Sequence, residues 1–577
     1  MAEDLNIVDI ASKGVVKDTP PIALAPNIFT DVRNVRFKDG AIRKMEGELL
    51  LNNIADELTG SLSHGKVRYF AVWQDPNLQP TGCYYIFVVD LLNNNIIVGQ
   101  KVYIQDHLGN KRDITPSTLN SGNGFTFSTD GWMHTLFNGG FTFIINNGIE
   151  KPHYIKDTPG NTNINNIVLA ELPGWDSYNV AQTTHSDTFS TGDSNVFDLG
   201  QKVDFAANSI SVTGTTTKNA QAGSPAGSGT VNGTNFVPGA LPGSTPSVTG
   251  DNFQIYTDAS TNTTVIVIGN LSNGNTVTVN VNSRNPVNVR CGVLEAFGNL
   301  LVAGDLTEID TSGNTIRRLS GVVRTSDVAA PGALPINWNP FEAGASTADE
   351  FTLSETSQIQ DMKPLQGNMY IYATDSIHAM RLTGNVNVPV SFAPVTDEYG
   401  ALTKGAVKEY DGKHFVVGRN DIYVFQGNPS NIQTLSGGRV QTYFFDNLNP
   451  IHENQLMLMQ NHLENEIWVC YPTLDSLAGE LDEVLIWNYR DNTWTIRDLN
   501  GVMSGDMGPV KGGGVPSATV ALTGNSGSFG YTNRGKKESV AVTINGKTPR
   551  RTVGTKAKKT IAVASFTTFQ TNIREVV

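Results

Sequence analysis

The sequence of 577 residues is poor in charge and in cysteine, and it lacks long apolar runs. Charged residues make up 16% of the chain, against about 25% in typical soluble domains. No run of about 18 apolar residues occurs, so no membrane-spanning helix is expected. Long stretches of helical periodicity are nearly absent as well. With 57 glycines and many Asn, Thr and Ser residues, the composition favours a β-rich protein with many turns.

Cysteine and histidine patterns argue against a metal or redox site. Cys83, Cys291 and Cys470 lie far apart in apolar, strand-like runs, which predicts buried free thiols. The nine histidines show no metal-binding spacing, and no phosphate-binding loop or nucleophile motif occurs. The acidic start at Met1–Asp4 has no signal-peptide pattern. We therefore expect no catalytic residues, no metal, no cofactor, and assembly in a reducing cytoplasm.

Charge is unevenly distributed along the chain. The formal net charge is −13, yet the segment from Arg534 onward carries ten Lys and Arg residues against Glu538 and Glu575. That segment is therefore +8 and the remainder is −21. An acidic body with a basic end is a charge asymmetry that indicates a contact with an acidic partner or a disordered tail.

One short pattern recurs through the chain, a glycine followed by two strand-like runs. In the segment 405–427, HFVV and IYVF flank the turn-like GRND. Similar pairs follow Gly140, Gly298 and Gly367, and Gly412 opens the last one. The interval from Gly367 to Gly412 is 45 residues, close to the roughly 40–45 residues of one four-stranded propeller blade. Seven residues are then expected in buried blade strands: Met369, Ile371, Phe415, Val417, Ile422, Val424 and Trp487.

A change of composition marks an insertion within this repeat. Residues 171–286 are rich in Thr, Asn, Ser and Gly, and 223–250 has few apolar residues, which predicts a flexible loop. Removing these 116 residues reduces the interval of 158 residues between Gly140 and Gly298 to 42. We therefore predict a mainly β fold, a β-propeller with a platform β domain and an inserted small β domain. The expected segments are 1–66 (arm and platform), 67–170 (propeller), 171–286 (insert), 287–499 (propeller) and 500–577 (platform segment with basic tail).

An amphipathic hairpin is expected at residues 25–48. Asp39 and Gly40 form a hairpin turn signal, and basic residues alternate with apolar ones on either side of it. Two interpretations are open: a solvated basic face, or a docking surface for another protein. The basic residues concerned are Arg33, Arg36, Arg43 and Lys44.

Four segments resemble the tail nozzle proteins (tail tubular protein B) of short-tailed, podovirus-type bacteriophages. They read NIFTDVRNVRFKDGAIRKMEG, FTFIINNGIEKPHYI, HFVVGRNDIYVFQGNPSNIQTLSGGRVQTYFF, and EIWVCYP followed by VLIWNYRDNTWTI. The resemblance covers residues 25–155 and 287–499. It implies a homohexameric virion protein below the tail adaptor ring, with fibres or spikes outside and genomic DNA passing through its lumen. In that setting the insert would form the distal nozzle tip.

Two other functions are weighed against this one. Propeller glycosidases need two carboxylates flanking the scissile bond, but Asp305, Asp310, Asp375, Asp421 and Asp491 mostly stand at turn-like positions. We interpret them as turn residues and expect no enzyme. A receptor-binding tail fibre or lectin-like protein remains the alternative, because the Thr- and Asn-rich insert would suit it.

Overall fold

The computed structural model describes most of the body of the chain and shorter stretches of its insert and C-terminal part. The described residues are 12–25, 27–45, 48–53, 62–78, 83–107, 109–128, 131–156, 163–175, 288–309, 315–339, 347–353, 357–385 and 388–508. To these are added 183–188, 196–199, 208–214, 219–220, 230–232, 239–243, 252–258, 260, 263–268, 276–283, 519–524, 550–553, 557–560 and 572–576. The protein is mainly β, with many small antiparallel sheets.

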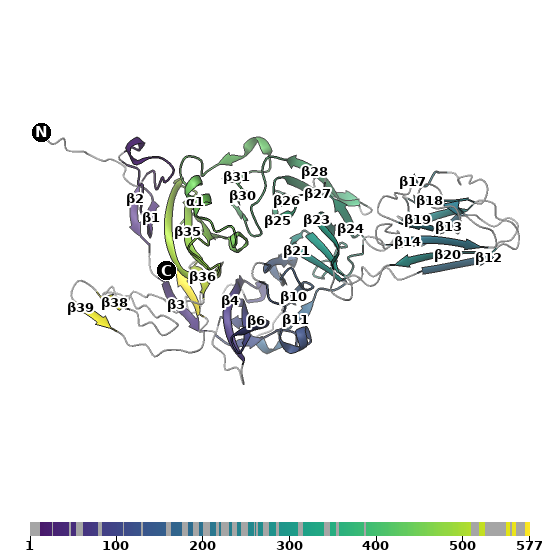
Figure 1. The fold of residues 1–577 in the computed structure, drawn as a ribbon, viewed down its shortest axis with the longest axis horizontal. Helices are drawn as coiled ribbons and strands as arrows, with labels where there is room; N and C mark the ends of the chain where they lie inside the picture. The colour runs from purple at the N-terminus through teal and green to yellow at the C-terminus, as the bar shows by residue number, and fades with distance from the viewer. Residues whose placement is uncertain are drawn as a thin grey trace.

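Six antiparallel sheets follow one another along the body, each beginning with four strands joined in sequence order (Figure 1). The first sheet contains β4 (Leu62–Trp73), β5 (Tyr84–Asn93), β6 (Ile96–Asp106) and β7 (Lys111–Asp113). The second contains β8 (Met133–Phe137), β9 (Thr142–Asn146), β10 (His153–Lys156) and β11 (Leu169–Glu171). The third contains β21 (Asn288–Phe297), β22 (Leu300–Ile309), β23 (Thr315–Thr325) and β24 (Asp349–Thr352).

The other three sheets follow without a large interruption. The fourth contains β25 (Ile359–Leu365), β26 (Asn368–Ala373), β27 (Ile377–Asn385) and β28 (Val388–Thr396). The fifth contains β29 (Val407–Tyr410), β30 (Lys413–Val417), β31 (Ile422–Phe425) and β32 (Gln433–Thr434). The sixth contains β33 (Met457–Asn461), β34 (Glu466–Tyr471), β35 (Leu481–Asn488) and β36 (Thr493–Gly508). The α-helix α1 (Gln441–Asn447) joins the fifth sheet to the sixth.

Short 3-10 turns lie in the connections. They are η1 (Pro21–Ala23), η2 (Pro76–Leu78), η3 (Leu119–Gly122), η4 (Asn138–Gly140), η5 (Ile164–Asn166), η6 (Pro429–Asn431) and η7 (Glu453–Gln455).

The four glycines of the repeated pattern occupy the same structural position. Gly140, Gly298, Gly367 and Gly412 each stand in the turn between the first and second strands of a sheet. Gly412 has φ +69° after Asp411 at φ +44°, a pair of left-handed residues typical of a two-residue hairpin turn. Each of these glycines is followed by two strands of the same sheet, so the strand pairs predicted from the repeat are confirmed. The equivalent turn of the sixth sheet uses Asn465 at φ +57°, so the glycine pattern does not detect it.

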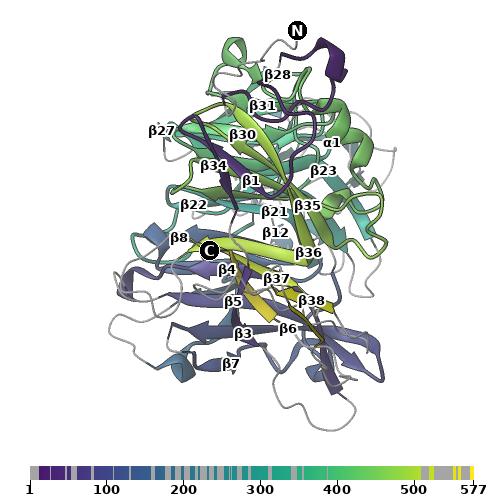
Figure 2. The same ribbon diagram turned by 90° about the vertical axis from the view of Figure 1, so that its left-hand side faces the viewer.

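Apolar side chains fill the space between each sheet and the next. One buried cluster joins the first and second sheets, a second joins the second and third, and a third joins the third and fourth. The largest cluster joins the fourth, fifth and sixth sheets. The sixth sheet also contacts the first, because Phe70 N donates to Ser504 Oγ (3.0 Å) and Val72 N donates to Asp506 Oδ2 (2.9 Å). Accordingly, β36 lies beside β4 (Figure 2).

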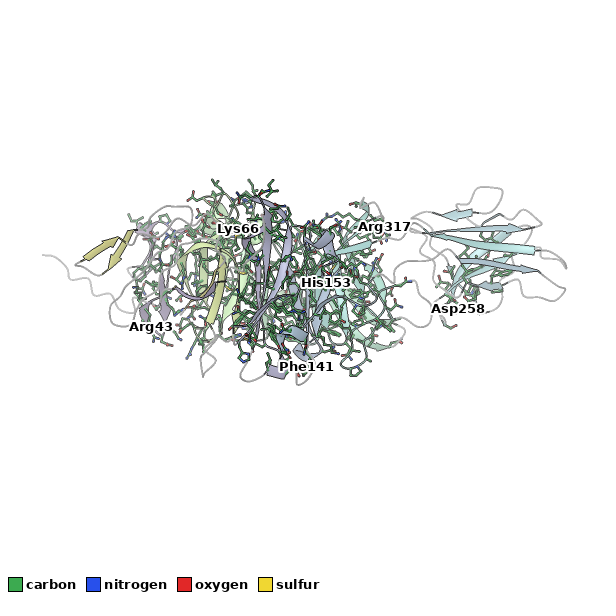
Figure 3. The ribbon with its side chains drawn as sticks, turned by 90° about the horizontal axis from the view of Figure 1, so that it is seen from below. Arg43, Lys66, Phe141, His153, Asp258 and Arg317 are labelled. Carbon is green, nitrogen blue, oxygen red and sulfur yellow. The ribbon has the colours of Figure 1, made fainter. Side chains whose placement is uncertain are left out.

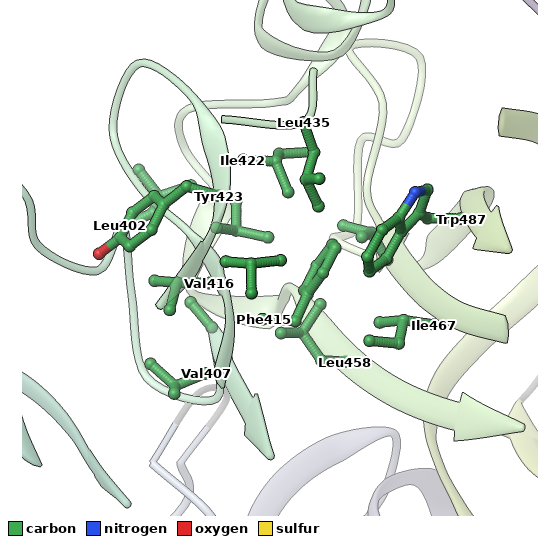
Figure 4. Packing of buried hydrophobic residues seen from close by; sticks show 14 of the residues in the cluster. Leu402, Val407, Phe415, Val416, Ile422, Tyr423, Leu435, Leu458, Ile467 and Trp487 are labelled. Carbon is green, nitrogen blue, oxygen red and sulfur yellow. The ribbon is translucent and has the colours of Figure 1, made fainter. Parts of the chain in front are cut away.

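Aromatic rings hold the fifth and sixth sheets together. Trp487 of β35 stacks on Phe415 of β30 with ring centroids 5.5 Å apart, and it meets Tyr410 edge-on at 5.7 Å. Figure 4 shows Trp487 and Phe415 in this cluster with Ile422 close by. All seven residues expected in buried strands are buried, each at 5% exposure or less.

Strands from both ends of the chain extend the sixth sheet. Beyond β36 the order continues through β37 (Thr519–Gly524) and β40 (Asn572–Val576) to β3 (Glu48–Asn53). The N-terminal hairpin of β1 (Val35–Lys38) and β2 (Ala41–Lys44) turns at Asp39 and Gly40, as predicted, and β1 packs along β36. A further hairpin pairs β38 (Arg550–Val553) with β39 (Ala557–Thr560). The two terminal segments are thus joined in one sheet.

The inserted segment forms two small sheets of its own. One contains β12 (Thr183–Thr188), β20 (Thr276–Ser283), β14 (Asn208–Gly214) and β16 (Thr230–Asn232). The other contains β13 (Val196–Asp198), β19 (Thr263–Ile268), β18 (Asn252–Asp258), β15 (Asn219–Ala220) and β17 (Gly239–Ala240). Figure 1 shows these strands at one end of the molecule, with β1, β2, β38 and β39 at the opposite end. Most of the loop predicted at 223–250 lies outside the described residues, but β16 and β17 within it pair with the insert's sheets.

We expect the variant Ile422→Asp to unfold at a clearly lower temperature than the parent protein. Ile422 is fully buried in the largest apolar cluster, so the change buries a carboxylate without a partner and costs several kcal/mol, on the order of 4. Ile451, which is 82% exposed, provides the control Ile451→Asp, for which about 0.5 kcal/mol or less is expected. Thermal unfolding followed by circular dichroism measures both. Equal unfolding temperatures for Ile422→Asp and the parent would contradict the burial of this strand.

Candidate functional site

Strands from several sheets surround a cavity in the middle of the body. Its lining comes from β4, β8, β25, β29, β33 and β36 and from the residues next to them. The cavity has a volume of about 210 Å³ and includes Arg68, His134, Lys363, Lys408 and Asp506 in its wall. The strands that supply these residues come from five of the six sheets, so only the tertiary structure assembles this site.

A buried ion cluster at this cavity joins three of the six sheets. Lys363 Nζ on β25 lies 2.5 Å from Glu295 Oε2 on β21, and it lies 3.9 Å from Asp361 Oδ1. Thr135 on β8 donates its hydroxyl to the other oxygen of Glu295. Burial by itself would lower the pKa of Lys363, but the charges of Glu295 and Asp361 outweigh it and raise that pKa. Both oxygens of Glu295 are therefore occupied, and the cluster cross-links the second, third and fourth sheets.

Asp361 is the carboxyl group of this cluster that keeps an unsatisfied oxygen. It is fully buried, its Oδ1 accepts from the backbone N of Met362 (2.8 Å), and its Oδ2 has no hydrogen-bond partner among the described residues. Burial raises its pKa to about 6, although the charge of Lys363 opposes the shift. Asp361 therefore loses its proton at a much higher pH than an ordinary aspartate does.

A second pair in the wall is uncharged at neutral pH. Tyr69 of β4 and Nδ1 of His134 of β8 are hydrogen-bonded, which connects the first sheet to the second. Burial lowers the pKa of His134 and raises that of Tyr69. The imidazole is thus neutral at pH 7, as is the Tyr69 hydroxyl. His134 also stacks on Phe143 at 4.9 Å, so its ring is held in place by packing.

A larger polar cavity of about 460 Å³ adjoins the first one, because Lys404 and Asn454 line both. Asp305 lies in its wall and is held by Arg318 Nη2 (3.4 Å), Lys404 Nζ (3.5 Å) and Gln358 Nε2 (3.1 Å). The expectation that Asp305 is a turn residue is wrong. It lies inside β22 at a β-bulge with φ +53°, a conformation that Asp tolerates better than most residues.

The other aspartates considered from the sequence behave as expected where the structure describes them. Asp375 is exposed in the bend between β26 and β27, and Asp491 stands in the turn between β35 and β36. Asp421 lies in the turn before β31 and accepts from Ile422 N (2.7 Å). Asp310 lies outside the described residues. Sequence reasoning missed Glu295, Asp361 and Lys363, because alternating charged residues in a strand usually indicate a solvated face.

All three cysteines lie in the described part of the chain, where they form no disulfide and are buried, as predicted. Burial raises the pKa of each thiol, to about 12 for Cys291, so they remain protonated and unreactive at neutral pH. Among the described residues no group of three or more His, Cys, Asp or Glu side chains is arranged to hold a metal ion. No helix in the described part is long and apolar enough to cross a membrane.

Several basic side chains of the N-terminal hairpin form ion pairs with carboxylates elsewhere in the chain. Arg33 Nη1 lies 2.7 Å from Glu483 Oε2 and 2.5 Å from Asp498 Oδ1, and Arg36 Nε lies 2.5 Å from Glu466 Oε1. Of the two interpretations of this hairpin, the solvated basic face is therefore wrong for Arg36, whose side chain is only 15% exposed, whereas Arg33 is ion-paired but still exposed. The side chains of β2, Arg43 among them, remain exposed, and Figure 3 shows Arg43 at the edge of the body away from the insert.

Comparisons with known proteins do not assign the chain to a family. No family model matches it, and no curated protein matches it. Among solved structures, Hsv2 of Kluyvelomyces marxianus is similar over 43% of this chain at 10% identity, with a TM-score of 0.24. The chain spans 64% of the length of that protein. The computationally designed protein Ika8 is similar over 79% of this chain and 92% of its own length, at 10% identity and a TM-score of 0.31. TM-scores this low identify neither a shared fold nor a shared function.

We expect Arg36→Ala to destabilise the protein strongly and Arg43→Ala to leave it nearly unchanged. Glu466, the partner of Arg36, is 1% exposed, so the first variant leaves a buried carboxylate without its counter-charge, at about 3–5 kcal/mol. Arg43 is exposed, and about 0.5 kcal/mol or less is expected there. Urea unfolding monitored by tryptophan fluorescence compares the two. Similar unfolding midpoints would show that the Arg36–Glu466 pair is not structural.

The variant Asp361→Asn should gain stability relative to the parent protein as the pH rises. A folded-state pKa of about 6 against an ordinary value of 3.8 means that the folded protein holds this proton more tightly than the unfolded chain. The stability that the protonated group contributes is present below about pH 4 and is lost as the pH rises through 6. The difference in unfolding free energy between variant and parent should therefore rise by about 2 kcal/mol between pH 4 and pH 7. Asp375→Asn is the exposed control, and a constant difference for Asp361→Asn would refute the burial of this charge.

Proposed function

We propose that the six sheets are the blades of one β-propeller. Three observations support this arrangement. Each sheet contains a four-stranded antiparallel meander, consecutive sheets pack face to face, and the sixth sheet contacts the first through β36 and β4. The first strands β8, β21, β25, β29 and β33 each contact the next in that order, as the innermost strands of adjacent blades would. The central cavity then lies on the propeller axis.

We further propose that the chain is a structural virion protein, the subunit of a hexameric tail nozzle that closes the tail tube of a short-tailed bacteriophage and conducts DNA at ejection. The observation that carries this proposal is that the segments with the family resemblance coincide with the segments that form the six sheets. The segments that resemble nozzle proteins, 25–155 and 287–499, supply the N-terminal hairpin and nearly all strands of the six sheets. The insert, for which no resemblance exists, supplies two separate sheets at one end of the molecule (Figure 1).

The two ends of the elongated molecule suit two different contacts. The strands β3, β37 and β40 bring both terminal segments together at the end away from the insert. In the proposed nozzle this end forms the platform that meets the tail adaptor ring. The insert then forms the distal tip, and fibres or spikes dock on the outside.

Electrostatics supports a tube that passes DNA without holding it. Each Lys or Arg that contacts a phosphate adds salt-sensitive affinity, and residues before 534 carry a formal charge of −21. Arg33, Arg36 and Lys38 are engaged with carboxylates of the same chain, so these cations are not free to bind a duplex. A nozzle with such subunits would let DNA slide.

Counting the copies in the native assembly tests the proposed function. We expect six copies of the 62.2 kDa chain by native mass spectrometry, and a ring with a central lumen by negative-stain imaging, alone and with the adaptor ring. A variant lacking residues 223–250 should also give six copies, because that loop belongs to the insert. The assembled ring should not retain duplex DNA at physiological salt.

Other results would favour the rival functions. Three copies would indicate a tail fibre or receptor-binding protein, and a single copy would suit an enzyme. Tight retention of duplex DNA by a ring that lacks residues 534–560 would contradict the proposed passage of DNA. This deletion removes nine of the ten Lys and Arg residues of the tail and keeps β40 in its sheet.

A further inference from the structure

The larger polar cavity gathers positive charge from separate parts of the body. Arg290 on β21 and Arg318 on β23 come from the third sheet, Lys404 precedes β29, and Arg419 stands in the turn between β30 and β31. These four cations face two carboxylates in the lining, those of Asp305 and Glu453. The cavity therefore carries a net positive charge inside a chain that is acidic overall.

Two of the guanidinium groups have no counter-ion among the described residues. Arg290 Nε is buried without a hydrogen-bond partner there, and a buried donor without a partner is unfavourable. Arg419 is exposed and makes no ion pair with a described residue. Asp305 engages Arg318 and Lys404 only at 3.4 and 3.5 Å, which leaves donors of both side chains available. The lining thus offers more donors than its own carboxylates occupy.

The remaining wall is hydrogen-bonding rather than apolar. Thr307, Gln358 and Gln360 contribute polar side chains, and the chain passes close by at Gly148 and Gly292. A side chain could not replace the hydrogen atom at Gly292, since a Cβ there would lie 2.2 Å from Asp305 Oδ2 and 2.7 Å from Lys404 Nζ. The absence of a side chain at Gly292 leaves space for Asp305 and Lys404 to approach each other at the cavity wall.

We propose that this cavity binds a small anion that carries two or more phosphate groups. Guanidinium groups match phosphate oxygens with paired hydrogen bonds, and cations from different sheets are better bridged by several linked phosphates than by a single one. The volume of about 460 Å³ falls in the range of small-molecule sites, roughly 300–1,000 Å³. A cavity of this size cannot admit a DNA duplex, so the ligand is a free small molecule rather than a nucleic acid backbone.

Inorganic triphosphate is the probe that tests this site. Isothermal titration calorimetry at constant ionic strength should show one triphosphate bound per chain, with weaker binding of orthophosphate. Arg290→Gln and Arg419→Gln should each weaken triphosphate binding by about tenfold or more, because each removes charge-assisted hydrogen bonds. The matched control is Arg43→Gln, which removes an exposed cation from β2 at the edge of the body and should leave the affinity unchanged.

Several outcomes would overturn the proposal. They are the absence of binding at millimolar triphosphate, equal affinity for orthophosphate, or equal weakening by Arg43→Gln. Arg419 is exposed, so Arg419→Gln should fold like the parent, and unchanged binding by this folded variant would also count against the site. The test uses the full chain and does not depend on the number of copies in the assembly. Failure here leaves the nozzle proposal untouched, and failure of that proposal leaves this one untouched.

Discussion

Burial of both faces of strands inside the sheets is the constraint on which the structure depends. In β5, β26 and β34 nearly every residue is buried, irrespective of which face its side chain occupies. A strand buried on both faces needs a continuous apolar run rather than strict alternation, and YYIFVV, MYIY and EIWVCY are such runs. The apolar clusters between consecutive sheets and the contact of β36 with β4 provide this cover.

The few charges of the body are used in a way that follows from this packing. Three carboxylates at or below 1% exposure, Asp90, Glu308 and Glu466, each lie against an arginine: Arg68, Arg317 and Arg36. A buried carboxylate without such a partner would carry a large desolvation cost. The pairs therefore limit which strands can lie next to each other, and they explain why a chain with so little charge still has charges in its interior.

Local sequence predicted the hairpins well and the neighbours of each sheet poorly. The glycine repeat identified the first turn of four sheets, and Asp39-Gly40 identified the N-terminal hairpin. The glycine repeat missed the equivalent turns of two sheets. In the first sheet a long connection joins β4 to β5, and in the sixth sheet Asn465 at positive φ takes the place of the glycine. Local sequence also misassigned Asp305, since a β-bulge and a turn both favour a residue that accepts a left-handed conformation. The ion pairs of Arg33 and Arg36 join residues more than 400 positions apart, and no local pattern indicates them.

The sequence by itself determined which short stretches pair as antiparallel hairpins. Its change of composition also marked residues 171–286 as an inserted segment. Turn residues and β-branched strands act over a few positions, so they can be recognised without knowing the rest of the fold. Only the tertiary structure decided that residues from five sheets line one cavity and that Glu295, Lys363 and Asp361 form a cluster. The same holds for the four cations around the larger cavity. Those groupings depend on how whole sheets pack against one another, and packing of distant surfaces leaves no regular spacing in the chain.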